Sequence, residues 1–300
     1  WRMDGMGKGL PVLKCWHLVP PSSLRTVENS AMKFKARVVE EGINVSKTHP
    51  LAEAGTLVVG LGAMFALTIA AFLMMIEVSL YFVSPEDEAA LFADWTLTEL
   101  NAQATSDPRV RETQALVDRL SQHWPDANYQ FRVAIYDSET PNAMAVPGGL
   151  IIVTEGLLDQ VTSENELAFV LGHELGHFKH RDHLRVLGRG VALSVLMAVA
   201  SGTDVTGVGL SLADLTLRSF GRTQEAEADR FGLELIHAEY RHINQAWRFF
   251  ERLVDGGHEI PDRWSYLATH PNPTDRKAAL INQAKENRWN TSGELTRLAW

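Results

Sequence analysis

The strongest constraint in this sequence is a run of twenty residues, Leu57–Ile76, that contains no charged side chain. Glu77 interrupts the run, and apolar residues then continue to Val83. A helix rises about 1.5 Å per residue, so twenty residues span about 30 Å, the thickness of the hydrocarbon core of a bilayer. A core helix of a soluble protein is usually shorter and carries a polar stripe. We therefore predict one transmembrane helix over residues 57–83.

The charges on either side of this run predict its orientation. Four basic residues lie shortly before it, whereas the first basic residue after it is Arg109; the four are Lys33, Lys35, Arg37 and Lys47. The positive-inside rule then places the N-terminal side in the cytoplasm. Residues 1–56 are expected to be a basic, unstructured leader, in which Met32 is a candidate natural start. Residues 84–300 are expected to form one domain in the periplasm, attached to the inner (cytoplasmic) membrane.

Charge and cysteine content exclude several classes of protein. The chain has a formal net charge of −9, so it is a poor candidate for binding nucleic acid through phosphate neutralisation. Its single cysteine, Cys15, lies in the leader. A disulfide within the chain and a cysteine-based zinc site are therefore excluded, and a metal site in the main domain must use histidine and carboxylate ligands.

The main domain is predicted to be α+β, mainly helical with a small sheet. Helical spacing of apolar residues predicts helices over Asp87–Gln103 and Arg109–Trp124. Short β-branched and aromatic runs predict strands at Phe131–Tyr136 and Gly149–Thr154. A further helix begins at Ser163, which forms a capping box with Glu166. Its apolar face consists of Leu167, Val170, Leu171, Leu175 and Phe178.

This capped helix contains the pattern HExxH, formed by His173, Glu174 and His177. Histidines four residues apart lie one above the other on a helix, so both imidazoles can reach one metal ion. Glu174 is then placed to take a proton from water beside the metal. A surface helix with incidental histidines is the alternative, and the apolar residues around the motif argue against it.

A catalytic zinc site has three protein ligands, so a third ligand must lie elsewhere. In RTQEAEADRFG, Glu225 and Asp229 share one helix face, whereas Glu227 points away. We predict Glu225 as the third ligand and Asp229 as the group that orients a ligand imidazole. A solvated acidic helix face is the alternative. The nearby His180 and His183 are expected to face solvent or to lie behind the ligands.

Four motifs in this order resemble the HtpX / CAAX-prenyl-endopeptidase family of zinc metallopeptidases, which are gluzincins. The motifs are NAMAVPGGLIIVTEGLL, HELGH, EAEAD and THPNPTDR, within residues 130–282. The resemblance implies a zincin-like fold, one Zn2+ per chain held by His173, His177 and Glu225, and Glu174 as the base. It also implies that His270 and Arg276 stabilise the transition state. Finally, it implies an edge strand for pairing with substrate, namely Ala143, Met144, Ala145 and Val146.

The sequence departs from this family in having one clear membrane span where the prenyl endopeptidases have several. A second apolar stretch, residues 191–200, is too short to cross a bilayer. It is predicted to be either a core helix or a hydrophobic flap near the cleft or the membrane surface. Prenylated-peptide processing is therefore in doubt, and the chain looks more like the members that degrade misfolded proteins.

The predicted function is that of a membrane-anchored zinc endopeptidase for unfolded or misfolded envelope proteins, in protein quality control. The alternatives are a catalytically silent, membrane-tethered chaperone or binding module, a structural or redox metal site, and a soluble protein whose core contains residues 57–83. The oligomeric state, the natural substrate and the cleavage preference are not predicted.

Overall fold

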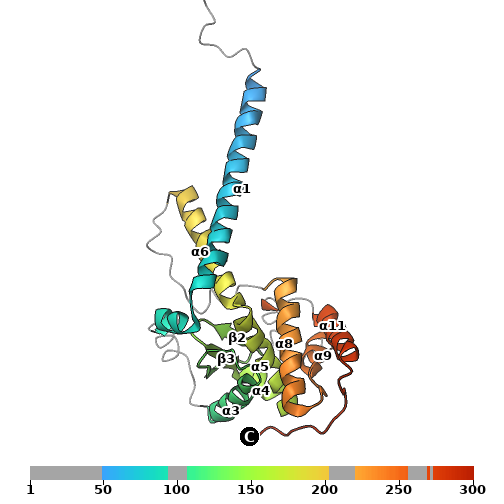
Figure 1. The fold of residues 1–300 in the computed structure, drawn as a ribbon. Helices are drawn as coiled ribbons and strands as arrows, with labels where there is room; N and C mark the ends of the chain where they lie inside the picture. Colours follow the sequence, from blue (N-terminus) through green and yellow to red (C-terminus); the bar gives the residue numbers. More distant parts are fainter. Residues whose placement is uncertain (1–48, 94–106, 203–219, 256–268, 271–272) are drawn as a thin grey trace, which may run out of the picture. The chain divides into compact units, whose positions relative to one another are not determined.

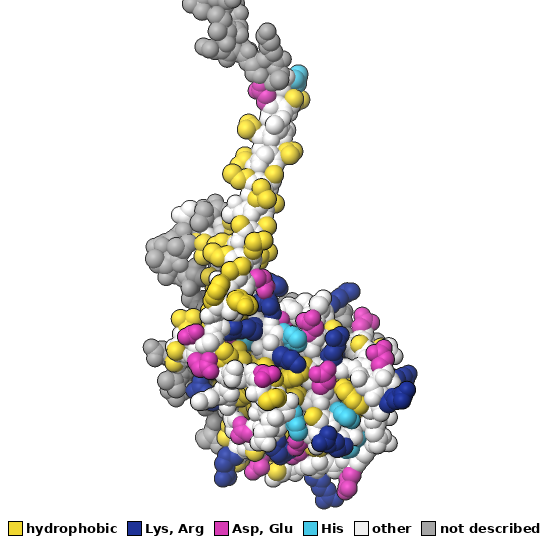
Figure 2. All heavy atoms as spheres, in the orientation of Figure 1, with side chains coloured by type: hydrophobic (Ala, Val, Ile, Leu, Met, Phe, Trp, Pro, Cys, Tyr) yellow, Lys and Arg dark blue, Asp and Glu magenta, His cyan; other side chains and the backbone are white. Residues whose placement is uncertain are grey.

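The computed structural model describes residues 49–93, 107–202, 220–255, 269–270 and 273–300 (Figure 1). Among these residues only α1, Pro50–Phe82, is long and apolar enough to cross a membrane. None of its residues is buried, and apolar side chains cover its length (Figure 2). At 33 residues it is about 50 Å long, more than a hydrocarbon core requires. The predicted leader lies almost wholly outside the described residues.

After α1, a helical segment covers residues 85–93, and the rest of the predicted helix Asp87–Gln103 lies outside the described residues. The next helix is α3, Arg109–Gln122. It is followed by β1, Arg132–Tyr136, β2, Ala143–Val146, and β3, Leu150–Thr154. The α+β prediction, including both strands predicted from β-branched runs, is confirmed.

The sheet has the order β1-β3-β2. β1 runs parallel to β3, with Arg132 opposite Leu150, whereas β2 runs antiparallel to β3, with Val146 opposite Leu150. β3 is buried along its whole length, because Ile151 and Val153 belong to the main hydrophobic core and Leu150 and Ile152 belong to a smaller hydrophobic cluster. β2 is an edge strand, and it packs against α5, Glu164–Lys179. This position brings the edge of the sheet beside the HExxH motif.

α5 is the central helix of the domain, and every residue from Asn165 to Phe178 is buried. Its N-cap is Ser163, whose side chain accepts a hydrogen bond from the N–H of Glu166. The second half of the predicted capping box differs, because the Glu166 carboxylate accepts from the N–H of Thr162 instead of Ser163. It also contacts Arg252. The prediction of one apolar face was too narrow, because elements cover α5 on all sides.

The remaining helices follow the sheet in the chain. They are α4, Glu155–Gln160; α6, Asp182–Ser201; α8, Arg222–Tyr240; α9, Arg248–Asp255; and α11, Pro273–Glu286. Of these, α8, α6 and α9 contact α5 directly, and α8 makes the most extensive contact. The two backbones approach closely where Gly172 faces Gly232 and Gly176 faces Ala228. α5 and α8 therefore hold the functional side chains they carry at short range.

We expect Gly176→Ala to destabilise the domain and weaken metal binding. A Cβ at Gly176 would lie 2.6 Å from the Cα and 2.8 Å from the carbonyl oxygen of Ala228. Backbone atoms cannot turn aside as a side chain can, so α8 must move away from α5, at about 1–3 kcal/mol of unfolding free energy. Denaturant unfolding and zinc titration measure the two effects. Gly62→Ala on α1 is the control, because nothing lies within 4 Å of that position, and equal losses in both variants would contradict the explanation.

Candidate metal centre

The HExxH motif lies in the buried second half of α5, and both of its histidines are 0% exposed. Their Nε2 atoms are 3.1 Å apart. Phe220 stacks on the His177 ring, with ring centroids 3.8 Å apart, and so restricts its rotation. The spacing of four residues therefore brings two imidazole nitrogens to one point, as the sequence predicted.

α8 brings Glu225 to the same point. Glu225 Oε2 lies 3.7 Å from His173 Nε2, and Glu225 Oε1 lies 3.5 Å from His177 Nε2. The carboxylate is 1% exposed, so the acidic run EAEAD is not simply a solvated helix face. Glu227, in contrast, is 44% exposed in its side chain, as the helical spacing predicts.

A fourth ligand atom comes from His270, which precedes α11. Its Nδ1 lies 3.2 Å from His173 Nε2 and 3.0 Å from Glu225 Oε1. Within the described residues, His173, His177, Glu225 and His270 form a buried cluster whose ligand atoms all lie within 4.8 Å of one another. The resemblance placed His270 near the metal, and the structure places it where a fourth ligand would lie.

The spacing of these atoms fits one zinc ion. Zinc binds imidazole nitrogen and carboxylate oxygen at about 2.0–2.2 Å, so ligand atoms at tetrahedral angles lie about 3.3–3.6 Å apart. The observed distances run from 3.0 Å, between His270 and Glu225, to 3.7 Å, between His173 and Glu225. Two histidines and a carboxylate are also a donor set that zinc prefers. The cluster can therefore hold one metal ion.

Two carboxylates orient the histidines from behind. Asp229 Oδ1 lies 2.9 Å from His173 Nδ1, and Asp182 Oδ2 lies 3.1 Å from His177 Nδ1. Each carboxylate can accept a hydrogen bond from the Nδ1–H of its histidine, which leaves Nε2 as the ligand atom. Gln224 in turn donates to Asp182, 2.6 Å away. The sequence analysis predicted this orienting role for Asp229 but missed it for Asp182. The only local indication for Asp182 is that it is an acidic residue five positions after His177.

Arg276 lies on the outer side of these groups and is 5% exposed. It donates from Nε and Nη2 to the two oxygens of Asp229, at 2.7 and 2.6 Å. Its Nη1 lies 2.7 Å from Glu225 Oε2, and its guanidinium covers the ring of Phe250. In this geometry Arg276 holds a ligand carboxylate and an orienting carboxylate in place.

The electrostatics of the cluster favour a cation. Burial alone would raise the pKa of Glu225, but the charges of His270 and Arg276 hold it well below its usual value. Burial and the neighbouring Arg276 lower the pKa of His173, which keeps that imidazole neutral. Burial would also lower the pKa of His177, yet the hydrogen bonds with Asp182 and Glu225 outweigh it and raise the pKa to about 9. The surroundings that favour a proton on His177 also favour a metal ion.

Glu174 points from α5 toward the edge strand. Its Oε2 accepts a hydrogen bond of 2.8 Å from the N–H of Ala145 on β2. Its Oε1 is buried and has no hydrogen-bond partner among the described residues, although His270 Nε2 lies 3.8 Å away. A buried carboxylate oxygen of this kind, beside the metal ligands, is placed to accept a proton from water.

The two histidines after the motif have different surroundings. His180 is partly exposed and lies 3.9 Å from Glu227. His183 is 3% exposed and its Nε2 lies 2.8 Å from Glu88 Oε1. His183 therefore does not face solvent. Its ring packs on Phe178 and lies behind the metal centre, which was the second of the two expectations for this residue.

Glu88 was missed by the sequence analysis, although it joins three parts of the domain. It is 0% exposed, and it accepts hydrogen bonds from Tyr129 Oη and from the N–H of Gly148, both at 2.8 Å. Arg181 donates to it at 3.2 Å and also donates to the carbonyls of Leu80 and Val83. Glu88 thereby connects the end of α1, the β2–β3 turn and the start of α6.

Glu88 makes stability depend on pH. Burial would raise its pKa, but the interactions with His183, together with the hydrogen bonds from Gly148 and Tyr129, outweigh burial and lower the pKa from 4.5 to about 2. A carboxyl whose pKa is depressed in the folded state stabilises above its unfolded pKa and loses that stabilisation as pH falls through the folded pKa. We expect Glu88→Gln to lose about 3 kcal/mol of unfolding free energy near pH 6. The difference from the parent should narrow as pH falls from 4.5 toward 2.

Denaturant unfolding across this pH range measures the effect, with Glu112→Gln on the exposed face of α3 as the control. A difference between parent and Glu88→Gln that stays constant with pH would contradict the assignment.

Comparison with known proteins bears on this centre. Residues 106–284 match the profile described as Peptidase family M48. The chain is 29% identical over 200 residues to "Metalloendopeptidase OMA1, mitochondrial" of Danio rerio, covering 59% of this chain and 41% of the relative. It is 26% identical over 216 residues to "Beta-barrel assembly-enhancing protease" of Yersinia pestis, covering 67% and 44%. It is 30% identical over 157 residues to "Mitochondrial metalloendopeptidase OMA1" of Schizosaccharomyces pombe, covering 50% and 45%. The chain thus matches less than half the length of each of these relatives.

Proposed function

The chain belongs to peptidase family M48, and on that basis we propose that it is a zinc-dependent endopeptidase anchored in a membrane. The observation that carries this proposal is the buried cluster of His173, His177, Glu225 and His270 with the unbonded oxygen of Glu174 beside it. The names of the relatives, a metalloendopeptidase and a protease, agree with this activity.

In the proposed reaction, His173, His177 and Glu225 hold the zinc ion, and Asp229 and Asp182 orient the two imidazoles. A bound zinc ion supplies Lewis acidity and makes water acidic enough to lose a proton near neutral pH. Glu174 accepts that proton on Oε1 and returns it to the amine of the leaving peptide.

We assign the stabilisation of the oxyanion to His270, because its Nε2 faces the same point as Glu174 Oε1. Arg276 contributes to the reaction indirectly, through the ligand Glu225. Its donors are engaged by Asp229 and Glu225, so it keeps the ligand carboxylate in place during the reaction.

Substrate is proposed to bind along β2. Successive residues of an antiparallel strand direct their backbone groups alternately toward and away from the partner strand. The N–H of Ala145 bonds Glu174, and that of Ala143 bonds the side chain of Asn142, so these two residues face away from β3. Met144 and Val146 are the residues that face β3. An extended peptide that adds to this edge beside the base would pair with the outward carbonyls of Ala143 and Ala145, or would displace the side chains of Asn142 and Glu174 from their N–H groups. Recognition through the backbone suits unfolded proteins.

The proposed cellular setting follows from α1 and from the basic residues that precede it. Residues 57–83 span the inner membrane once, residues 1–56 lie in the cytoplasm, and residues 84–300 act in the periplasm on misfolded or damaged envelope proteins. Within the part of the chain that the structure describes, α1 is the one helix long and apolar enough to span, whereas the prenyl endopeptidases of the resemblance have several spans. Resistance to extraction by alkaline carbonate tests the span, and release of the chain into the wash would contradict it.

Removal of the metal tests the activity. We expect a chelator to abolish cleavage of unfolded casein by the full chain, and stoichiometric zinc to restore it, because the ligand cluster is the only proposed source of acidified water. Metal content measured beside activity should show one zinc per chain. Bound iron without peptidase activity would favour a redox site, and cleavage unaffected by complete metal removal would contradict the proposal.

A further inference from the structure

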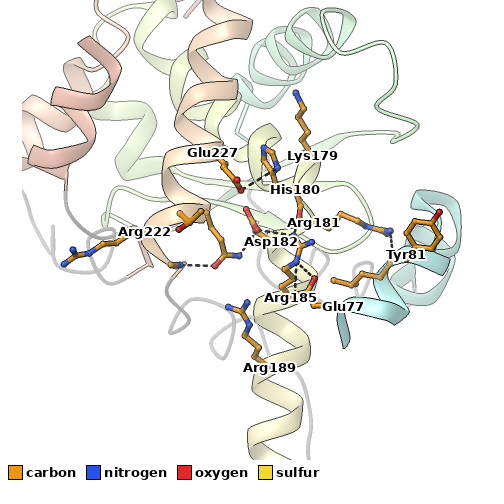
Figure 3. A pocket seen from close by; sticks show the side chains of 14 residues that line it. Glu77, Tyr81, Lys179, His180, Arg181, Asp182, Arg185, Arg189, Arg222 and Glu227 are labelled. Carbon is orange, nitrogen blue, oxygen red and sulfur yellow. Dashed lines mark hydrogen bonds and ion pairs between the residues drawn. The ribbon is translucent and has the colours of Figure 1, made fainter. Parts of the chain in front are cut away.

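A pocket rich in basic residues lies where α1 meets the domain (Figure 3). It has a volume of about 730 Å³, and its walls come from the end of α1, the α5–α6 turn and the start of α8. Its five basic residues are Lys179, Arg181, Arg185, Arg189 and Arg222, against three acidic residues, Glu77, Asp182 and Glu227. The pocket is therefore positive within a chain whose net charge is −9.

Most of these charges already have partners. Arg185 pairs with Glu77 at 2.9 Å, Arg181 pairs with Glu88, and Lys179 lies over the ring of Phe231. Arg189 and Arg222 are exposed, and neither forms an ion pair with any described residue. These two cations remain available for an anion from outside the chain. The Arg222 side chain points away from Arg189 in Figure 3, so one anion can contact both only when the exposed Arg222 side chain turns toward the pocket.

An apolar groove adjoins this pocket. It lies between α1 and α6 and is lined mainly by Ile69, Phe72 and Leu73 of α1 and by Ala192, Leu193 and Leu196 of α6. Arg189 lines both the groove and the pocket. The two cavities are therefore neighbours on either side of Arg189, with the polar one at the domain and the apolar one along α1.

The groove lies beside the uncharged part of α1. α6 passes beside Ile76 at Gly188, where an added Cβ would lie 3.0 Å from the Ile76 side chain. It then runs back along α1 to the level of Thr68 (Figure 1). From Arg189 to Ser201 this part is about 18 Å long, enough for one leaflet but not for a bilayer.

This arrangement decides between the two sequence predictions for residues 191–200. A core helix is wrong, because Leu193 and Met197 are 60% and 61% exposed. The exposed apolar side chains lie instead beside a helix proposed to be in lipid.

From this juxtaposition we propose that the pocket and the groove together bind one anionic phospholipid. Its phosphate contacts Arg189 and Arg222, and one acyl chain lies between α1 and the apolar half of α6. An acidic peptide would use the pocket alone and leave the groove exposed to lipid, whereas a phospholipid has the right chemistry for both ends. The inference rests on the proposed membrane span of α1, which brings the groove into the outer leaflet.

The test uses the full chain purified in mild detergent, with bound lipid counted by native mass spectrometry. Phosphatidylglycerol and phosphatidylcholine with identical acyl chains are offered together. A cation near a membrane surface favours anionic lipid by about 1 kcal/mol, so two cations should give a preference of about 30-fold for phosphatidylglycerol. We expect Arg189→Gln/Arg222→Gln to remove the preference. Neither residue touches the metal cluster, so the zinc content should stay at the parent value.

Arg111→Gln/Arg132→Gln is the matched control, because it removes two exposed arginines that line neither cavity. Ala192→Phe fills the groove and should reduce binding of both lipids. Millimolar inorganic phosphate should not displace the phospholipid, because phosphate makes no use of the groove.

Different results would contradict the lipid site, the membrane span and the peptidase activity. Equal loss in the control variant, no preference for phosphatidylglycerol in the parent, or displacement by inorganic phosphate would overturn the lipid site. Extraction of the parent from membranes by alkaline carbonate would overturn the membrane span itself, and with it the lipid site. Loss of casein cleavage on chelation remains a separate test of the peptidase.

Discussion

Glu174→Gln is expected to lower kcat/KM for an unfolded protein substrate by roughly 10²–10⁴-fold, the usual contribution of a general base. The loss should fall on kcat, because Glu174 acts on a proton during the reaction and does not hold the substrate. The variant should still contain one zinc per chain. The amide oxygen of glutamine can accept the hydrogen bond from the N–H of Ala145, so β2 should keep its position.

The control for Glu174→Gln is a substitution of a glutamate that has no proposed role and lies on a neighbouring helix. Glu234→Gln on α8 removes the same charge from an exposed position and should retain full activity. A Glu174→Gln variant as active as the parent would show that another group is the base. A variant that loses zinc along with activity would show that Glu174 acts on the metal site instead of on water. Activity independent of both Glu174 and zinc would favour the alternative of a binding module copurified with another protease.

Much of the metal centre follows from local sequence, because a helix places residues four apart on one face. His173 and His177 needed only this spacing, and Glu225 and Asp229 needed the same rule on a second helix. The association of the two helices is also visible in the sequence afterwards. Gly172, Gly176 and Gly232 are the residues that allow the backbones to approach.

Contacts between distant segments could not be predicted in this way. Glu88 and His183 are 95 residues apart, and no spacing rule relates an acid after a membrane span to a histidine after the HExxH helix. Asp182 was passed over because it lies beyond the end of α5, where helical geometry no longer places side chains. The positive pocket at the end of α1 is a similar case, because its basic residues come from the end of α5, the α5–α6 turn, α6 and the start of α8, and not from the sequence next to the span.

Arg276→Met is expected to destabilise the metal-free protein by about 3–5 kcal/mol, because it leaves two buried carboxylates without their cation. Arg276 lies 2.6 Å from Asp229 and 2.7 Å from Glu225 and is almost completely buried. Burial would raise the pKa of Asp229, and the charge of Arg276 keeps it lowered instead. Methionine has a similar length and can still pack on Phe250, so the loss reports charge more than volume.

Zinc should reduce the unfolding free energy that Arg276→Met loses. This reduction distinguishes a charge effect from a packing effect. A divalent cation on Glu225 neutralises one of the two buried carboxylates that lack a cation in the variant, whereas in the parent Arg276 repels the same cation. The difference in unfolding free energy between parent and Arg276→Met should therefore be smaller at saturating zinc than in chelator. By linkage, the folded variant must then bind zinc more tightly than the parent. Arg230→Met, on the exposed face of α8, should change neither quantity. A stability difference that zinc leaves unchanged would show that Arg276 stabilises the fold by packing alone, and would remove it from the electrostatics of the metal centre.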